Sequence, residues 1–221
     1  RVLSPAAMRN LREPFKAKAV ALLDKLIAKR RFDAVPDLAE SFPLSVFPDA
    51  VGIREDGREQ LLPFSTMVFN SFGPQNERFK QSLRDAEKVV AWINEQCKRD
   101  SLAPGGFGAG IWTACDAGEI TADEAHILVR GQLTAGLDTT VNGLANAMYA
   151  FAMNPAEWDR VRADRSLIKP AFDEVLRWES PVQTFFRTRN RLSSAPIASP
   201  AKRIAAIPRL TPRTWRRPIG Y

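Results

Sequence analysis

One long helix constrains the fold of this chain more than any other feature of its sequence. Thr121 and Glu124 have the spacing of a capping box, in which a hydroxyl and a carboxylate satisfy each other's free backbone amides. The helix that begins there cannot pass Asn154-Pro155, because the proline ring blocks its continuation. The predicted helix has about 34 residues and a length of about 50 Å, so it spans a whole domain.

The rest of residues 1–190 also has mainly helical patterns, and the expected fold class is mainly α. Ser4-Pro5 is typical of a helix start, and one apolar face continues to about Arg31. Prolines and glycines break residues 32–57, and Pro63 interrupts or kinks a second helical stretch. The further helices are expected at 58–72, 75–99, within 103–118, and at 155–163 and 167–179. VQTFFRT (182–188) has the character of a strand, which adds small β elements.

Residues 191–221 differ from the rest of the chain. They contain seven Lys and Arg and no Asp or Glu, which leaves 25 basic residues to match the 25 acidic ones in residues 1–190. The net charge of +7 therefore comes from this basic, proline-rich tail. We expect no packed structure there and suspect a frameshift near Asn190. The first residues include no initiator methionine or apolar leader, so we expect the start to lie inside a longer parent.

The segment AGLDTT (135–140) places poor helix formers in the middle of the long helix, where broken local preferences often mark function. Gly136 is expected to leave the helix surface open to a flat ligand. Thr139 can donate its hydroxyl to the carbonyl of Ala135, which loosens the helix locally. Asp138 adds a carboxylate, and an acid–alcohol pair suits proton delivery to a bound oxygen species. The alternative is a packing face with a solvent-facing Asp138.

Glu174 and Arg177 lie three residues apart on a predicted helix, so they share one face and can form an ion pair. Taken alone, such a pair is usually solvated and contributes little stability.

Together these motifs resemble the cytochrome P450 family. The matching segments are AGLDTTVNGLANAMYAFAMNPAEWDRVR (135–162), FDEVLRWESPVQTFFRT (172–188) and RVLSPAAM (1–8). The resemblance covers residues 1–190, which form a partial domain that starts at the family's third helix. It is nearest to bacterial members that oxidise small aromatic acids, such as para-methoxybenzoate demethylases.

The resemblance implies roles for particular residues. Asp138 and Thr139 match the oxygen-activating acid–alcohol pair, and Glu174 and Arg177 match the pair that supports the haem loop. The cofactor-binding residues it implies lie over the haem face or pair with a propionate: Ala135, Gly136, Arg1 and Arg187. The substrate pocket it implies has walls formed by Phe69, Phe72, Val182 and Phe185. Plain core packing remains the alternative for these four side chains.

Arg130 precedes Thr139 by about two turns of the helix. It is a candidate for binding a substrate carboxylate, because arginine recognises carboxylates well. A surface arginine without a ligand is the alternative.

The haem loop of the family, FxxGxHxCxG, is missing from this sequence, so no metal ligand is assigned. The loop's thiolate binds the iron, whereas Cys97 and Cys115 both precede the long helix. Phe107–Gly110 followed by Cys115 mimics the loop by coincidence, and Cys97 is expected to be a structural thiol. His126, the sole histidine, is expected on a helix surface or in packing.

The resemblance implies a parent monooxygenase with haem b, dioxygen, a small aromatic substrate, and electrons from NAD(P)H through a ferredoxin. A cytoplasmic protein without nucleic-acid or membrane partners is expected, and this chain is expected to be inactive. The alternative is a non-catalytic helical protein whose basic tail binds nucleic acid or an anionic membrane. The neutral charge balance of residues 1–190 argues against it.

Overall fold

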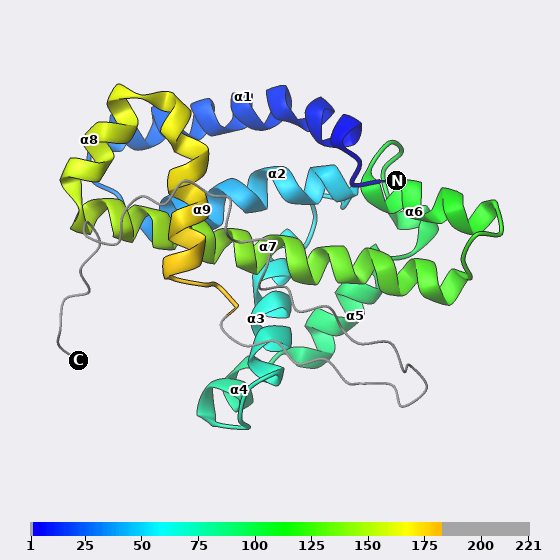
Figure 1. Cartoon of the computed structure of the whole chain (residues 1–221). Coiled ribbons are helices and arrows are strands. Elements are labelled where there is room, and N and C mark those ends of the chain that lie inside the picture. Colours follow the sequence, from blue (N-terminus) through cyan, green and yellow to red (C-terminus); the bar gives the residue numbers. More distant parts are fainter. Residues whose placement is uncertain (1, 183–221) are drawn as a thin grey trace, which may run out of the picture. The chain divides into compact units, whose positions relative to one another are not determined.

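The computed structural model describes residues 2–182, which belong to two compact units (Figure 1). The first unit extends to Asn142 and the second begins at Gly143. The long helix α7 (Ala122–Met153) contributes residues to both units. Residues 2–182 contain helices and turns but no strand, so the small β elements that we expected are not found there. All of the expected strand (182–188) except Val182 lies outside the described residues.

The first unit is a set of helices that pack around the first two thirds of α7. Helix α1 contacts α2, and α3 contacts both α4 and α5 (Figure 1). Two 3₁₀ turns, Arg58–Gln60 and Arg99–Ser101, precede α3 and follow α5. The α-helices of this unit before α7 are α1 (Pro5–Lys29), α2 (Ser41–Val51), α3 (Leu61–Ser71), α4 (Glu77–Ser82), α5 (Ala86–Gln96) and α6 (Phe107–Asp116).

Helix α2 lies where the prolines predicted a broken segment, so that prediction was wrong. A seven-residue π-helix (Ala34–Glu40) leads directly into α2. Pro43 lies in the first turn of α2, where a missing N–H costs nothing, while Pro48 lies inside the helix. Both rings are buried, and this burial offsets the weakened hydrogen-bond ladder. The helix ends at Gly52, whose φ of 96° is a left-handed cap.

The stretch expected as one helix over 75–99 is two helices, because a turn at residues 83–85 separates α4 from α5. The apolar pattern of this stretch predicts an inward face formed by Phe79, Leu83, Val90 and Trp92, and this prediction was partly wrong. Leu83 is exposed, and the buried positions of α5 include Val89 and Ile93. Val90 is only partly buried, whereas Trp92 is partly buried and does pack against the core. Pro63 does not break α3, since it lies in the first turn of that helix.

Helix α7 begins and ends as predicted. The backbone amide of Thr121 donates to Oε2 of Glu124 over 2.8 Å, and the amide of Glu124 donates to Oγ1 of Thr121 over 3.2 Å. Pro155 opens the next helix. Buried residues recur along α7 at every fourth position, and this stripe forms the centre of the first core: Ala125, Val129, Leu133 and Leu137.

The second unit consists of the end of α7, α8 (Pro155–Ala163), a 3₁₀ turn (Arg165–Leu167) and α9 (Ile168–Trp178). Ala150 of α7 and Val175 of α9 are buried together. The side-chain amide of Asn146 donates to the carbonyl of Glu179 over 2.8 Å, which ties the end of α9 to α7. The described helices include none with the length and apolar character that a membrane crossing requires.

Candidate functional site

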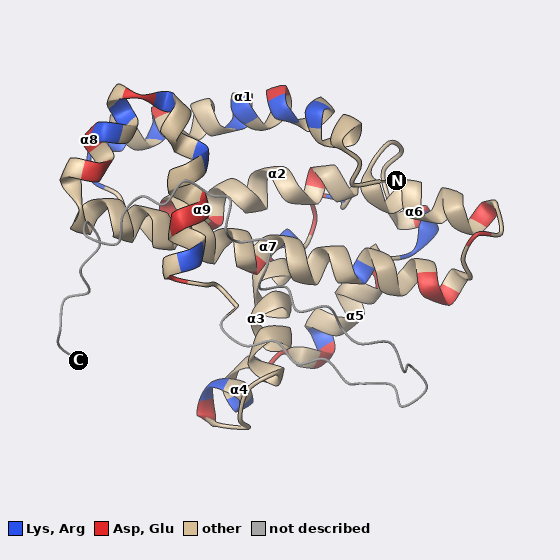
Figure 2. Ribbon diagram, in the orientation of Figure 1, with Lys and Arg blue, Asp and Glu red and all other residues tan. Residues whose placement is uncertain are grey.

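A strip of small and polar residues runs along α7 on a side that the first core does not use. Its members share an exposed or half-exposed position, and we call them the α7 strip: Gly131, Ala135, Asp138, Thr139 and Asn142. A Cβ atom added at Gly131 would meet no other atom within 4 Å, so the helix backbone is bare there. From Gly131 to the end of α7, Asp138 is the one charged side chain (Figure 2).

Gly136 does not open the helix surface, so our expectation for this residue was wrong. A Cβ atom at Gly136 would lie 2.2 Å from Cζ of Phe47, a residue of α2. The glycine therefore allows the aromatic ring of α2 to pack directly on the backbone of α7. The bare glycine of this helix is Gly131, one turn before Ala135.

The Thr139 side chain bonds back to the helix as predicted, and the Thr140 side chain does the same. Oγ1 of Thr139 donates to the carbonyl of Ala135 over 2.6 Å, and Oγ1 of Thr140 donates to the carbonyl of Gly136 over 2.8 Å. Each carbonyl oxygen then accepts a hydrogen bond from a side chain in addition to its place in the helix, and this arrangement loosens and bends helices locally. The hydroxyl oxygen of Thr139 keeps its lone pairs available to accept a proton or a hydrogen bond.

The Asp138 carboxyl group experiences two opposed influences. Partial burial raises its pKa above the ordinary value, because the charged form loses hydration. The side-chain amide of Asn142, which donates to Oδ2 of Asp138 over 3.0 Å, lowers the pKa. Burial is the larger influence, so Asp138 holds a proton more readily than an exposed carboxyl group does.

The predicted ion pair on α9 is confirmed. Nε of Arg177 donates to Oε2 of Glu174 over 2.7 Å, and Nη2 donates to Oε1 over 2.5 Å, so the pairing is bidentate. This hydrogen bonding raises the pKa of Arg177. The Glu174 side chain is 17% exposed and that of Arg177 is 59% exposed, so one partner is held in the fold and the other faces outward.

The proposed pocket residues are only partly described. The rings of Phe69 and Phe72 meet edge to face with centroids 5.9 Å apart, but Phe72 itself is 71% exposed. Val182 is also exposed. Arg1, Phe185 and Arg187 lie outside the described residues.

Arg130 follows His126 by one helix turn, and Nε2 of His126 lies 3.1 Å from the Asn94 carbonyl oxygen of α5, so both residues are on the side of α7 that faces α5. Its charge acts on Cys97, which follows α5, and its side chain projects from α7 roughly a quarter turn away from Gly131. The structure does not bring Arg130 together with the α7 strip on one face.

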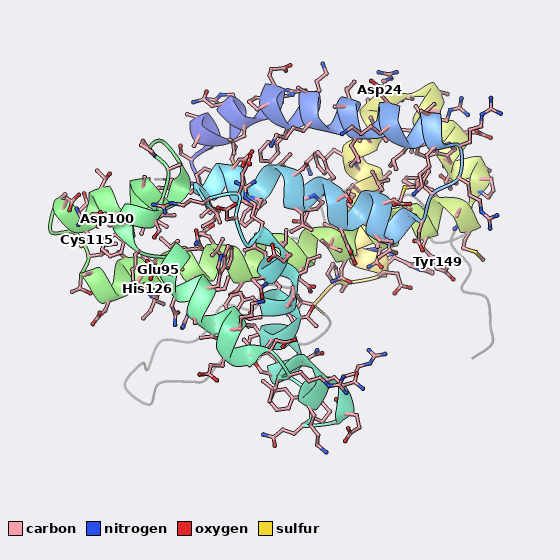
Figure 3. All side chains as sticks on the ribbon, turned by 180° about the vertical axis from the view of Figure 1, so that it is seen from behind. Asp24, Glu95, Asp100, Cys115, His126 and Tyr149 are labelled. Atoms are coloured by element: carbon pink, nitrogen blue, oxygen red, sulfur yellow. The ribbon has the colours of Figure 1, made fainter. Side chains whose placement is uncertain are left out.

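The cysteines and the histidine lie away from the α7 strip. Burial raises the pKa of Cys97 to about 12, so this residue is a neutral thiol, as expected of a structural cysteine. Nε2 of His126 lies 3.1 Å from the carbonyl oxygen of Asn94. Figure 3 shows His126 beside Glu95 at the end of α5 and Cys115 on α6. Residues 2–182 hold no cluster of three side chains that could bind a metal ion.

Two residues of this region escaped the sequence analysis. Asn142 follows Asp138 by four positions, a spacing that puts the two side chains on one helix face and could have identified it. Phe47 is 89 positions before Gly136, and nothing in the local sequence indicates their contact.

Comparison with known proteins gives the class. The chain is 50% identical over 227 aligned residues to cytochrome P450 CYP199A2 of Rhodopseudomonas palustris; the match covers all of this chain and 55% of the relative. It is 24% identical to a steroid C26-monooxygenase of Mycolicibacterium smegmatis over 85% of this chain and 44% of that protein. No family model matches the sequence.

Solved structures agree in fold. The crystal structure of P450BioI in complex with an acyl carrier protein ligated to hexadec-9Z-enoic acid matches with a TM-score of 0.71 at 23% identity, over 82% of this chain and 48% of that one. CYP109E1 from Bacillus megaterium in complex with testosterone matches with a TM-score of 0.70 at 22% identity, over 82% of this chain and 49% of that one.

The 50% identity to a cytochrome P450 over the whole chain defines the class, and the helical fold agrees with that of solved P450 structures. The chain belongs to that family and spans about half the length of the curated relatives that it matches.

Proposed function

We propose that the whole protein to which this chain corresponds is a haem-dependent monooxygenase that hydroxylates or demethylates a small aromatic acid. The observation that carries the proposal is the α7 strip, where Asp138 and Thr139 lie about two turns along the helix from backbone that is bare at Gly131. The 50% identity to CYP199A2, a cytochrome P450, supports the haem-dependent chemistry.

The residues of the chain fit one face of a haem group. Gly131 and Ala135 carry no large side chain, so a flat group can approach the helix there. Gly136 would act indirectly, by letting Phe47 pack behind the strip. Arg1 and Arg187 are the residues proposed to pair with the propionates. Haem b, when bound, supplies the activation of dioxygen, with electrons from NAD(P)H delivered through a ferredoxin.

Asp138 and Thr139 would handle the protons of this reaction. The raised pKa of Asp138 lets its carboxyl group hold a proton near neutral pH more readily than an exposed aspartate. The Thr139 hydroxyl donates a hydrogen bond to the Ala135 carbonyl. This bond leaves the lone pairs of the hydroxyl oxygen free to accept a proton. Together they can pass a proton along the strip.

A matched pair of threonine variants tests this role in a longer form of the protein that carries the haem loop. Thr139→Val and Thr140→Val each remove one hydroxyl that bonds back to the helix. We expect product formation from a benzoate-type acid to fall by about 10²-fold or more in the first and to change little in the second. Equal effects of the two changes would contradict the proposal.

The substrate part of the proposal rests on Phe69 and Phe72 as aromatic walls, with Val182 and Phe185, and on Arg130 as the carboxylate ligand. Arg130→Ala is expected to weaken binding of a benzoate-type ligand to the longer form. Unchanged affinity would remove Arg130 from the proposed site.

We further propose that the 221-residue chain does not itself bind haem through a thiolate. Both of its cysteines precede α7, and Cys97 is a buried, neutral thiol. The reduced chain with carbon monoxide should therefore lack the absorbance peak at about 450 nm that thiolate-ligated haem produces. A peak there would refute this statement without affecting the assignment to the family.

A further inference from the structure

Asn142 makes a double contact with Asp138 that its neighbours on α7 do not make. Its side-chain nitrogen donates to the backbone carbonyl of Asp138 over 2.9 Å and to Oδ2 of the Asp138 side chain over 3.0 Å. Thr139 and Thr140 reach back one turn in the same way, but each bonds to a backbone carbonyl. Asn142 thus joins the helix backbone and a functional carboxylate through one amide group.

We propose that Asn142 is a positioning residue for Asp138, which holds the carboxylate along the helix and keeps it available in its ionised form. This inference rests on the proposed function, in which Asp138 handles protons. Asn142 does not itself touch the reacting atoms.

The physical reason is the competition at the Asp138 carboxyl group. Burial disfavours the charged form, and a hydrogen-bond donor aimed at the carboxylate favours it. An acid that passes protons has to release them as well as bind them. Burial favours binding of the proton by Asp138, and the hydrogen bond from Asn142 favours its release, so the proposed role needs both. Among the described residues, burial and the Asn142 hydrogen bond are the influences that act on this carboxyl group.

A purely structural role explains Asn142 less well. Asparagine is a poor helix former, and this side chain is exposed, so it contributes little packing. A residue that served the helix alone would need the bond to the carbonyl of Asp138 but not the bond to Oδ2.

Carboxyl titration of the 221-residue chain tests the proposal. The side-chain carbons of aspartate are labelled with ¹³C and followed by NMR against pH, and Asp138→Asn identifies the resonance by its loss.

We expect Asn142→Ala to raise the Asp138 pKa by about 0.5 to 1 unit, the effect of losing one hydrogen bond to a charged group. In Asn142→Thr, the hydroxyl can still donate a hydrogen bond to the carbonyl of Asp138. This variant should also raise the Asp138 pKa, because the hydrogen bond from the side-chain amide to the carboxylate is lost. Thr140→Val is the control, with the wild-type pKa.

Each outcome is decisive. An unchanged Asp138 pKa in Asn142→Ala, or a wild-type value in Asn142→Thr, would overturn the proposal. So would an equal rise in Thr140→Val, since that would indicate general loosening of the helix. Failure of the proposed function gives a different result: turnover by the longer form would survive Asp138→Asn, while the titration would still show the Asn142 contact.

Discussion

At the scale of single residues, two glycines five positions apart in α7 have opposite surroundings. Gly131 faces open space, and Gly136 faces the ring of Phe47. Sequence alone treats both as poor helix formers, since a residue without Cβ has the same backbone freedom at either place. Only the neighbouring helix α2 distinguishes them.

The two glycines predict opposite effects of the same substitution. Gly131→Ala should raise the free energy of unfolding by up to about 1 kcal/mol, because alanine favours the helix and meets no other atom. Gly136→Ala should lower it by about 1 to 3 kcal/mol, because the new methyl group displaces the Phe47 ring. Urea unfolding followed by circular dichroism measures both. A gain in stability at Gly136 would show that α2 does not pack on this position.

At the scale of elements, the capping box predicts how the start of α7 responds to acid. The Thr121 amide and hydroxyl lower the pKa of Glu124 below its ordinary value of 4.5. The stabilisation is therefore complete above that value and is lost as the pH falls through the lowered pKa. Unfolding midpoints should fall more steeply on acidification in the wild type than in Glu124→Gln.

Asp123→Asn is the control for that measurement. Asp123 also lies in the first turn of α7, and its substitution removes one charge while the Thr121–Glu124 hydrogen bonds remain. It should retain the steep acid response. If Asp123→Asn flattens the response as much as Glu124→Gln does, the general charge of the first turn is responsible, and the cap is not.

Neighbouring residues of α1 provide a second test at this scale. Leu26 is 5% exposed and Ile27 is 71% exposed, because only one face of α1 packs against the fold. Leu26→Ala should lower the free energy of unfolding by about 2 to 5 kcal/mol. Ile27→Ala should change it by no more than about 0.5 kcal/mol, again measured by urea unfolding. Similar losses at both positions would mean that the outer face of α1 is also covered.

At the scale of the whole molecule, the two thiols report on the integrity of the first unit. Cys97 lies in its core with a pKa raised to about 12, whereas Cys115 is half-buried on α6. Near neutral pH, a thiol reagent should modify Cys115 in the folded chain and reach Cys97 only after unfolding. Cys115→Ser isolates the Cys97 reaction. Rapid modification of Cys97 in that variant under native conditions would show that the unit opens readily.

The sequence by itself determined the features that local chemistry controls. The capping box and Pro155 fix the ends of α7, and the back-bond of Thr139 and the Glu174–Arg177 pair span one helix turn each. Hydrogen bonds and ring sterics within a few residues act in the same way in any fold that makes the helix. These local features also supported the resemblance to the cytochrome P450 family.

The tertiary structure decided what depends on segments far apart in the chain. It made a helix of α2 despite Pro48, placed Val89 instead of Val90 in the core, and filled the space beside Gly136 with Phe47. Burial and packing against distant residues outweigh local propensity by more than a short pattern can reveal.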